Sequence, residues 1–511
     1  MLWTSLGVFL SGLALVASFP PWNQGWLVWI ALIPALLAAG RLPKPGCFTW
    51  RELAPGYIVG LLYFGGAFWW IGEVTVAGTV ALVLYIALYP ALWLALARRL
   101  WRREPPYTSA GNLLLAAELA SWWIVCEWLR GWLFAGFGWN DLGVALWRSL
   151  PLAQGARLGG VLLLSWLVVF VNVVGALTLV RFYHEVGKRQ KLSPHADFGV
   201  AMLAVALLFS YGARQIWPPA SEAKQVKTLR FALIQPNVPQ DEVHPFPPLE
   251  SLERHLVLTE TAAALRPQLV VWPETPVGVA ALVEPVYAQT LANLGRRSDF
   301  SLLLGSLDRV DGKFFNAAFF YPPHAAAPAQ RYYKHWLVPF GEYAPLADYL
   351  PVMRRLVPFD IDFSAGPGPG LFTLPDGTTA APLICYEDTL PAYVRRVGRL
   401  GPDLLINITN DGWFRGSPGA AQHLANAVFR SIETGRPLLR AGNTGISALV
   451  EPTGRVASRL EADGREVEIS GILSGEVSWT PRPAPTPYLR WGNWILALPL
   501  AFAARRVLRR R

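Results

Sequence analysis

Long apolar stretches separated by short polar links dominate both ends of this chain. Seven precede residue 214 and one follows residue 489, at about 5–19, 24–40, 55–72, 75–97, 112–129, 158–180, 196–213 and 490–504. Several approach the roughly 20 residues that a helix needs to cross a bilayer, although the shortest are marginal. We predict a transmembrane bundle of about seven helices over residues 1–213. One more transmembrane helix, with a basic tail, is predicted over 490–511.

The middle of the chain has a different periodicity. Short β-prone runs alternate there with longer helical runs; the former lie at 229–234, 269–272, 301–304, 381–386 and 404–408, the latter at 249–265, 283–297, 389–400 and 420–434. This alternation is typical of an α/β domain whose sheets are covered by helices. We therefore predict a separate α/β domain with its linkers over residues 214–489.

Basic residues lie in alternate links, which predicts the orientation of the helices. They are Arg41, Lys44 and Arg51, then Arg98, Arg99, Arg102 and Arg103, then Arg181, Lys188, Arg189 and Lys191, and finally the arginines of the tail. Links rich in Lys and Arg face the cytoplasm. Seven spans then leave residues 214–489 on the opposite side. We expect a multi-pass protein of the bacterial inner membrane with its α/β domain in the periplasm.

Composition supports this division. The 511 residues are 53% hydrophobic and only 16% charged, which indicates an integral membrane protein with a substantial water-exposed part. The net charge of +10 is explained by the basic links, so we expect no nucleic-acid partner. Three cysteines, at 47, 126 and 385, provide neither a disulfide framework nor metal-ligand spacing. We expect no metal and no cofactor.

Three chemically useful side chains follow β-prone runs of the middle domain: Glu274, Lys334 and Cys385. Catalytic groups favour such strand ends. A thiol nucleophile, a carboxylate base and a cation for the oxyanion would together allow attack on a carbonyl group and thioester formation. Each residue also has a structural alternative, namely a helix N-cap for Glu274, a solvated loop cation for Lys334 and an inert core thiol for Cys385.

The fifth apolar run carries ionisable residues, Glu118 and Glu127, followed by Arg130. Such groups in a membrane span are usually functional or mutually paired. Two interpretations stay open here. Glu127 and Arg130 form a structural pair at the interface, or they contribute to handling a lipid head group.

Several strings, taken in order, resemble the apolipoprotein N-acyltransferase family, a membrane-embedded branch of the nitrilase superfamily. They are EWLRGW at 127–132, WPE at 272–274, LVPFGEY at 337–343, CYE at 385–387, NDGWF at 410–414 and GRPLLR at 435–440. The resemblance covers essentially the whole chain. It implies an α-β-β-α sandwich beside the membrane helices.

The resemblance also implies an activity and its residues. An acyl chain would pass from a phospholipid to Cys385, and then to the α-amino group of the diacylglyceryl-cysteine at the N-terminus of an apolipoprotein. By motif match Glu274 is the general base, Lys334 the cation on the oxyanion side and Cys385 the nucleophile, while the supporting residues are Glu342, Tyr386 and Glu387. We expect the enzyme to be a monomer.

One departure from the family concerns a functional tryptophan beyond a QxNxPQ string, here at 235–240. The matching place lies near His244, which we expect to be an exposed loop histidine without that role. Trp413 either walls the acyl site or is a core residue. A membrane-tethered amidase that uses the same three residues with water is the alternative function, and the spans together with the 127–132 string argue against it. A non-catalytic lipid-binding or transport protein is disfavoured by the three intact residues.

Overall fold

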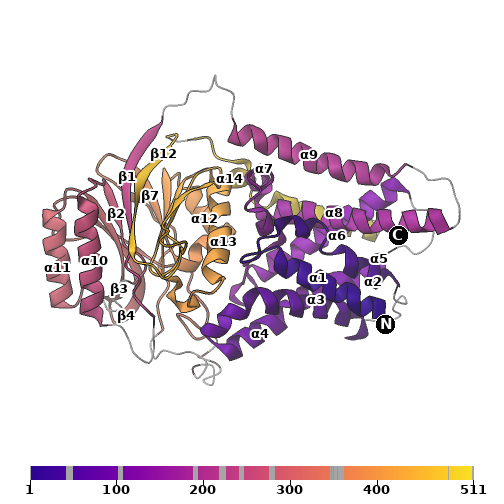
Figure 1. Cartoon of the computed structure of the whole chain (residues 1–511), viewed down its shortest axis with the longest axis horizontal. Helices are drawn as coiled ribbons and strands as arrows, with labels where there is room; N and C mark the ends of the chain where they lie inside the picture. Colours follow the sequence, from indigo (N-terminus) through magenta and orange to yellow (C-terminus); the bar gives the residue numbers. More distant parts are fainter. Residues whose placement is uncertain are drawn as a thin grey trace. The chain divides into compact units, whose positions relative to one another are not determined.

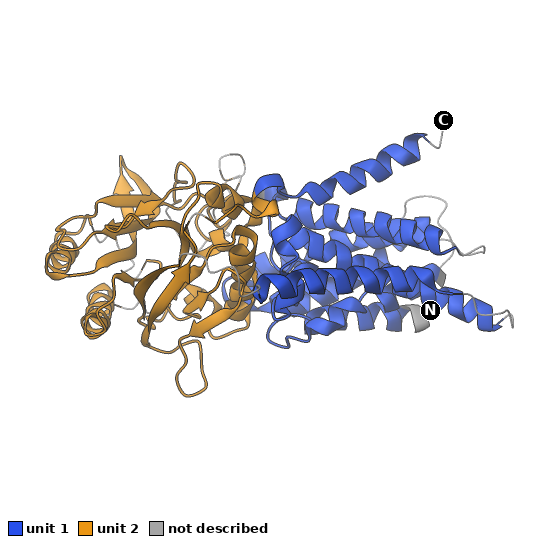
Figure 2. Cartoon of the chain, turned by 90° about the horizontal axis from the view of Figure 1, so that it is seen from above, with its two compact units in different colours: residues 1–219, 490–511 blue, residues 220–489 orange. Residues whose placement is uncertain are grey.

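The computed structural model describes residues 2–41, 50–101, 108–187, 194–217, 226–240, 247–275, 282–345, 347, 349, 354, 362–481 and 483–508. The predictions for Lys44, Cys47, Arg102, Arg103, Lys188, Arg189, Lys191 and His244 lie outside the described residues. The chain forms two compact units, coloured separately in Figure 2: residues 1–219 with 490–511, and residues 220–489. In sequence, the second unit is therefore inserted into the first.

The first unit consists of helices (Figure 1). They are α1 (Leu2–Ala17), α2 (Ile33–Arg41), α3 (Trp50–Phe68), α4 (Val76–Ile86), α5 (Leu88–Leu100), α6 (Ser109–Arg130), α7 (Leu150–Ala153), α8 (Ala156–Gly187), α9 (Ala196–Ile216) and α15 (Ala497–Leu508). In the sequence, α14 (Pro487–Trp491) spans the boundary between the two units. Large apolar side chains are exposed on these helices, among them Phe9, Leu84 and Leu207, which suits a lipid environment. A helix also satisfies its own backbone hydrogen bonds, which lipid cannot do.

Five segments of the described residues are long and apolar enough to cross a membrane: Trp50–Glu73, Val76–Leu100, Ser109–Arg130, Ala156–Gly187 and Ala196–Ile216. The protein is therefore a membrane protein. The remaining three predicted spans correspond to shorter helices, since α1 has 16 residues, α2 has 9 and α15 has 12. Part of the second apolar run winds as a 3-10 helix at Gly25–Trp29, which shortens α2.

The ionisable residues of α6 have partners from other parts of the first unit. Arg130 donates to Asp141 Oδ1 at 2.6 Å, and Glu127 Oε1 accepts from the backbone N–H of Leu142 at 2.8 Å. Glu118 pairs with Arg506 of α15. Glu127 and Arg130 therefore hold the segment after α6 through separate bonds. These contacts suit the structural interpretation, one of the two left open above, although the bonds run to Asp141 and Leu142 and not between the two side chains.

The second unit contains two six-stranded sheets. The first has the order β12-β1-β2-β3-β4-β5 and the second β11-β10-β9-β8-β7-β6. The bounds are β1 Lys227–Gln235, β2 Leu269–Val271, β3 Ser301–Val310, β4 Lys313–Tyr321, β5 Gln330–Tyr333, β6 Phe372–Thr373, β7 Thr379–Ile384, β8 Leu404–Thr409, β9 Leu438–Gly442, β10 Ala448–Val450, β11 Val456–Arg459 and β12 Gly471–Trp479.

The two sheets pack face to face, and helices cover their outer faces (Figure 1). Buried side chains from both sheets, such as Phe231, Val271, Ile384 and Ile406, form one apolar core. A second core lies between the first sheet and its helices, where Leu252 and Leu291 pack. The covering helices are α10 (Pro248–Ala263), α11 (Pro285–Arg297), α12 (Pro391–Gly398) and α13 (Gly419–Thr434). The predicted α-β-β-α sandwich is confirmed.

Strand direction brings several chain segments to common sheet edges. β1, β2 and β3 are parallel, as are β7, β8 and β9. β5 runs in the same direction as β3, because both pair with β4 in an antiparallel manner. The residues that follow β2 and β5 therefore leave the same edge of the first sheet. Those that follow β7 and β8 leave one edge of the second sheet.

Candidate active site

The predicted triad residues lie at these strand ends. Glu274 comes three residues after β2, Lys334 directly follows β5 and Cys385 directly follows β7. The segment after β2 crosses closely over β3 at Gly305, where a Cβ atom would lie 2.5 Å from the carbonyl oxygen of Pro273. Glycine is needed here because any side chain would push the Glu274 backbone away from the sheet.

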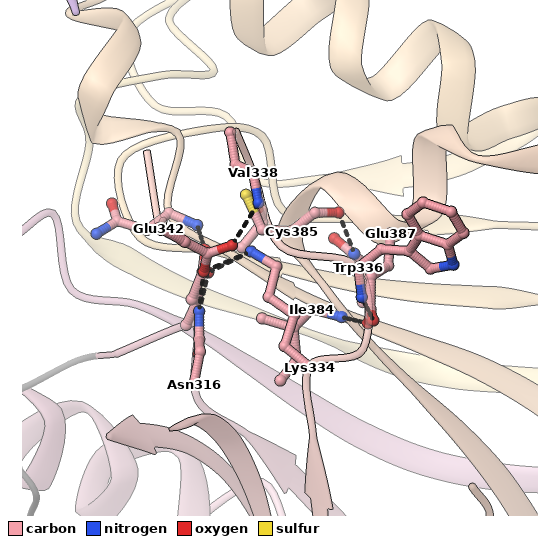
Figure 3. A network of polar contacts seen from close by, with 12 residues as sticks. Asn316, Lys334, Trp336, Val338, Glu342, Ile384, Cys385 and Glu387 are labelled. Atoms are coloured by element: carbon pink, nitrogen blue, oxygen red, sulfur yellow. Dashed lines mark hydrogen bonds and ion pairs between the residues drawn. The ribbon is translucent and has the colours of Figure 1, made fainter. Parts of the chain in front are cut away.

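Lys334 is the centre of a buried charged cluster. Its Nζ lies 2.9 Å from Glu342 Oε1 and 3.4 Å from Glu274 Oε1. Figure 3 shows the Glu342 and Lys334 side chains pointing toward each other. All three residues are buried. The formal charges of two carboxylates and one ammonium leave one negative charge in excess.

Both carboxylates are also held by amide groups. Asn316 of β4 donates through Nδ2 to Glu274 Oε1 at 2.7 Å. The same Nδ2 donates to Glu342 Oε1 at 2.9 Å (Figure 3). Glu274 Oε2 accepts from the backbone N–H of Asn410 at 2.9 Å. Glu342 Oε2 accepts from the N–H of Val338 at 2.8 Å. The orientation of each carboxylate is therefore fixed at both oxygens.

Cys385 begins a 3-10 turn, Cys385–Thr389, and has a positive φ of 50°. Burial raises the pKa of its thiol well above the ordinary value. Glu274 raises this pKa further, while Lys334 and the Thr409 hydroxyl oppose the rise. The resting thiol is therefore protonated, and it needs a base before it can act as a nucleophile.

The ammonium group of Lys334 is charged in this environment. Burial by itself lowers the pKa of Lys334, but the carboxylates of Glu342 and Glu274 outweigh it and the net pKa is raised. Glu387 accepts from the N–H groups of His335 and Ile384, so the segments that carry Lys334 and Cys385 meet at one carboxylate. The structure thus brings Glu274, Lys334, Glu342 and Cys385 into one cluster.

Glu387 braces the segments that carry Lys334 and Cys385. Its carboxylate accepts from the Tyr332 hydroxyl at 2.8 Å and from the N–H of His335 at 2.8 Å, both on the Lys334 side. It accepts in addition from the N–H of Ile384 at 2.9 Å, directly before Cys385. Burial raises the pKa of Glu387 to about 7, against the effect of these donors. Its contacts therefore join the ends of β5 and β7.

Two further predicted residues lie near this cluster in the sequence. Tyr386 is buried in the turn that begins at Cys385, and its carbonyl oxygen accepts from the Thr389 hydroxyl at 2.8 Å. Trp413 is 41% exposed, so its interpretation as a core residue is wrong. It lies in the 3-10 turn Asp411–Phe414, next to the Asn410 that holds Glu274.

Sequence reasoning missed the part played by Asn316. A single asparagine in a strand carries no signal of its own, and its strand was not among the predicted runs. The NDGWF string at 410–414 did contain a signal for Asn410, although it gave no reason to connect that residue with Glu274. Within the described part of the chain, no group of three His, Cys, Asp or Glu side chains is arranged to hold a metal ion.

Comparisons with known proteins agree with this architecture. Residues 11–174 match the apolipoprotein N-acyltransferase N-terminal domain, and residues 230–481 match the carbon-nitrogen hydrolase family. An apolipoprotein N-acyltransferase from Geobacter metallireducens is 35% identical and covers 88% of this chain and 85% of its own length. The one from Photobacterium profundum is 31% identical over 95% of this chain and 91% of its own length.

Among solved structures, an amidase from Nesterenkonia sp. is 18% identical, with a TM-score of 0.35, and covers 51% of this chain and 92% of that chain. The family assignment depends on the full-length relatives, because their similarity extends through the membrane helices and the two-sheet unit together. This chain belongs to the apolipoprotein N-acyltransferase family and is an acyltransferase enzyme of lipoprotein N-acylation.

Proposed function

We propose that this enzyme takes an acyl chain from a phospholipid and transfers it to the α-amino group of an apolipoprotein's diacylglyceryl-cysteine, through a thioester on Cys385. The observation that carries the proposal is the cluster of Glu274, Lys334 and Cys385 at strand ends of the second unit. A family whose members are named apolipoprotein N-acyltransferases supports the choice of acceptor.

In the first step, Glu274 accepts the thiol proton and the sulfur of Cys385 attacks the ester carbonyl carbon of the phospholipid. The high pKa of the thiol makes this base necessary. Collapse of the tetrahedral intermediate breaks the carbon–oxygen bond, and Glu274 returns the proton to the departing lysophospholipid oxygen. The acyl chain is then held as a thioester.

In the second step, the neutral amine of the acceptor cysteine attacks the thioester carbonyl. Glu274 takes a proton from the attacking nitrogen, and the Cys385 thiolate leaves and is reprotonated. The products are the N-acylated lipoprotein and the free enzyme. The two substrates use one site in turn, which makes the mechanism ping-pong.

Lys334 stabilises the oxyanion that forms in both steps. An ammonium has three N–H donors, and two are directed at Glu342 and Glu274. The third can point to the developing negative charge, where a buried cation is most effective. Glu342 keeps Lys334 charged and oriented, Glu387 braces the two strand ends, and Tyr386 belongs to the turn that presents Cys385.

The basic links of the sequence favour an inner-membrane protein whose second unit faces the periplasm. Attachment to membrane helices at both of its ends suits a domain whose two substrates keep acyl chains in lipid. Apolar surroundings also protect a thioester from water. We propose that the enzyme works as a monomer.

The test uses full-length protein in detergent micelles with phospholipid and a diacylated lipopeptide. We expect lysophospholipid, an acyl adduct on the Cys385 peptide by mass spectrometry, and then N-acylated peptide. Cys385→Ser should reduce adduct formation at least about a thousandfold. Undiminished labelling of Cys385→Ser would refute the nucleophile. Release of free fatty acid with no acylated peptide would instead identify a hydrolase.

A further inference from the structure

Close to Cys385 lies a second group of charged residues that the proposed mechanism does not use. Asp388, Asp411, His423 and Arg440 come from four different elements, and each side chain is at most 1% exposed. Asp388 belongs to the turn that begins at Cys385, and Asp411 to the turn after β8. His423 lies on α13 and Arg440 on β9.

The four residues form a closed ring of contacts. His423 has Nε2 at 2.8 Å from Asp388 Oδ1 and Nδ1 at 2.8 Å from Asp411 Oδ1. Arg440 donates through Nη1 to Asp388 Oδ2 at 2.6 Å and through Nη2 to Asp411 Oδ2 at 3.0 Å. All four carboxylate oxygens of the ring therefore have a partner within it.

The geometry determines the protonation state of His423. An ionised carboxylate only accepts hydrogen bonds, so each imidazole nitrogen that faces one must carry a proton. His423 is therefore an imidazolium, and two cations balance two anions in the ring. This balance matters because a buried charge without a partner is strongly destabilising.

Two asparagines connect this ring to the reacting groups. Arg440 Nη1 donates to Asn407 Oδ1 at 2.9 Å, and Asn407 Nδ2 donates to the carbonyl oxygen of Cys385 at 3.1 Å. On the other side, Asn410 directly precedes Asp411 and gives its N–H to Glu274 Oε2 at 2.9 Å. The ring thus reaches the backbone of the nucleophile and the carboxylate of the base.

The backbone of Cys385 needs such support. A left-handed conformation is unfavourable for a residue other than glycine, and Cys385 adopts it with φ of 50°. The fit around the ring is also tight. A Cβ atom on Gly445 would lie 2.3 Å from Asp411 Oδ2, so only glycine leaves room for that carboxylate.

We propose that the ring of Asp388, His423, Asp411 and Arg440 is a positioning device that holds Cys385 and Glu274 in reacting geometry, with His423 as an imidazolium. The proposal depends on the proposed function in one respect, because the reaction that this geometry serves is the proposed acyl transfer. His423 and Arg440 are positioning residues, because they act through Asn407 and the segment Thr409–Asp411 and not on substrate.

The test measures two rates on full-length protein in micelles. One is alkylation of Cys385 by iodoacetamide, read from the Cys385 peptide by mass spectrometry; the other is acyl-adduct formation at increasing phospholipid concentration. His423→Gln keeps a donor toward one carboxylate and loses the charge. We expect both maximal rates to fall about tenfold or more, because small misplacements of reacting groups are costly. The phospholipid concentration for half-maximal rate should stay within about twofold.

The matched control is Glu433→Gln, which also removes a buried charge from α13. Glu433 pairs with Arg430 at 3.0 Å in the same helix. Both rates should stay within about twofold of the parent in this control. Equal losses in His423→Gln and Glu433→Gln, or no loss in His423→Gln, would overturn the proposal.

His423→Gln removes one buried cation and could therefore fold poorly. A second variant keeps the test valid in that case. His423→Gln combined with Asp388→Asn restores charge balance and should recover thermal stability while the two rates remain low. Recovery of the rates together with stability would show a merely structural role and overturn the proposal. Normal alkylation of the parent without any acyl adduct would refute the proposed function and leave the positioning proposal standing.

Discussion

Two buried charged clusters lie around Cys385, and they differ in charge balance. The cluster of Lys334, Glu274 and Glu342 has two carboxylates for one ammonium. The ring around His423 and Arg440 has two cations for two carboxylates. The excess negative charge of the first cluster suits a proton acceptor. The balanced ring has no such capacity, and its closed contacts suit a rigid support.

The two clusters also differ in how far their hydrogen-bonding groups are occupied by partners within the cluster. Lys334 has three ammonium donors, and two of them are directed at Glu342 and Glu274. In the ring, both oxygens of Asp388 and both oxygens of Asp411 are already occupied by ring members. Substitutions in the first cluster should therefore change rates most, and substitutions in the ring should change stability as well.

The largest expected effect is that of Glu274→Gln on catalysis. A glutamine fills the same space but accepts no proton, so acyl-adduct formation should fall about 10²–10⁴-fold. Stability should fall by only about 1–3 kcal/mol, because one of the donors Asn316 and Asn410 loses its acceptor. Single-turnover labelling and thermal unfolding of the same preparation measure the two quantities. A near-normal labelling rate would remove Glu274 from the role of base.

Next in size is the effect of Arg440→Met on stability. It leaves two buried carboxylates with a single cation, which should cost about 3–5 kcal/mol of unfolding free energy. The additional change Asp388→Asn removes one carboxylate and should restore part of that loss. Thermal or denaturant unfolding of parent, single and double variants measures this coupling. If the loss of unfolding free energy in the double variant equalled the sum of the losses in the two single variants, charge balance would not explain the stability of the ring.

The smallest expected effect is a pH dependence of stability that requires His423. Burial and Arg440 lower the pKa of His423, but Asp388 and Asp411 outweigh them, so the folded pKa is raised above 6.5. A raised pKa means that the stabilisation is complete below about pH 6.5 and is lost as pH rises through the folded value. The slope is roughly 1.4 kcal/mol per pH unit between the two pKa values.

The measurement compares unfolding midpoints of the parent and of His423→Gln from pH 6 to 9. The parent should lose stability toward high pH more steeply than the variant. The charged groups that face His423 are Asp388, Asp411 and Arg440. The helix α12 also packs on α13, and its arginines make other contacts. Arg395 donates to the Tyr488 carbonyl, and Arg396 stacks on Tyr393. Parallel curves for the two proteins would show that the folded state holds no extra proton on His423 in this range, and His423 would then not be an imidazolium.

Some elements could be predicted because their signal is local. The apolar runs that became β2, β7 and β8 are short and bounded by polar residues, and the helices α10 to α13 have clear periodicity. β4 and β5 were missed, although one carries Asn316 and the other leads to Lys334. The length of the apolar run at 24–40 overestimated α2, since a run does not show where a 3-10 turn interrupts it.

The sequence predicted which residues belong to the site, but it did not predict which of them are in contact. Strings around Glu274, Lys334 and Cys385 indicated three polar groups at strand ends, and Glu342 and Glu387 came from the same strings. Nothing local connected Asn316 with two carboxylates, or Asp388 with His423. Those contacts join residues 26 to 42 positions apart along the chain.

By itself, the sequence determined that the chain has long apolar helices, where several of the strands lie, and which reactive side chains stand just beyond strand ends. These properties depend on hydropathy, periodicity and neighbouring residues, all of which are written locally in the chain. Only the tertiary structure decided that Glu274, Lys334, Glu342 and Cys385 meet, and that a balanced ring of charges lies close to the thiol. Distances between remote segments depend on how two sheets and their helices pack, and that packing is a property of the whole fold.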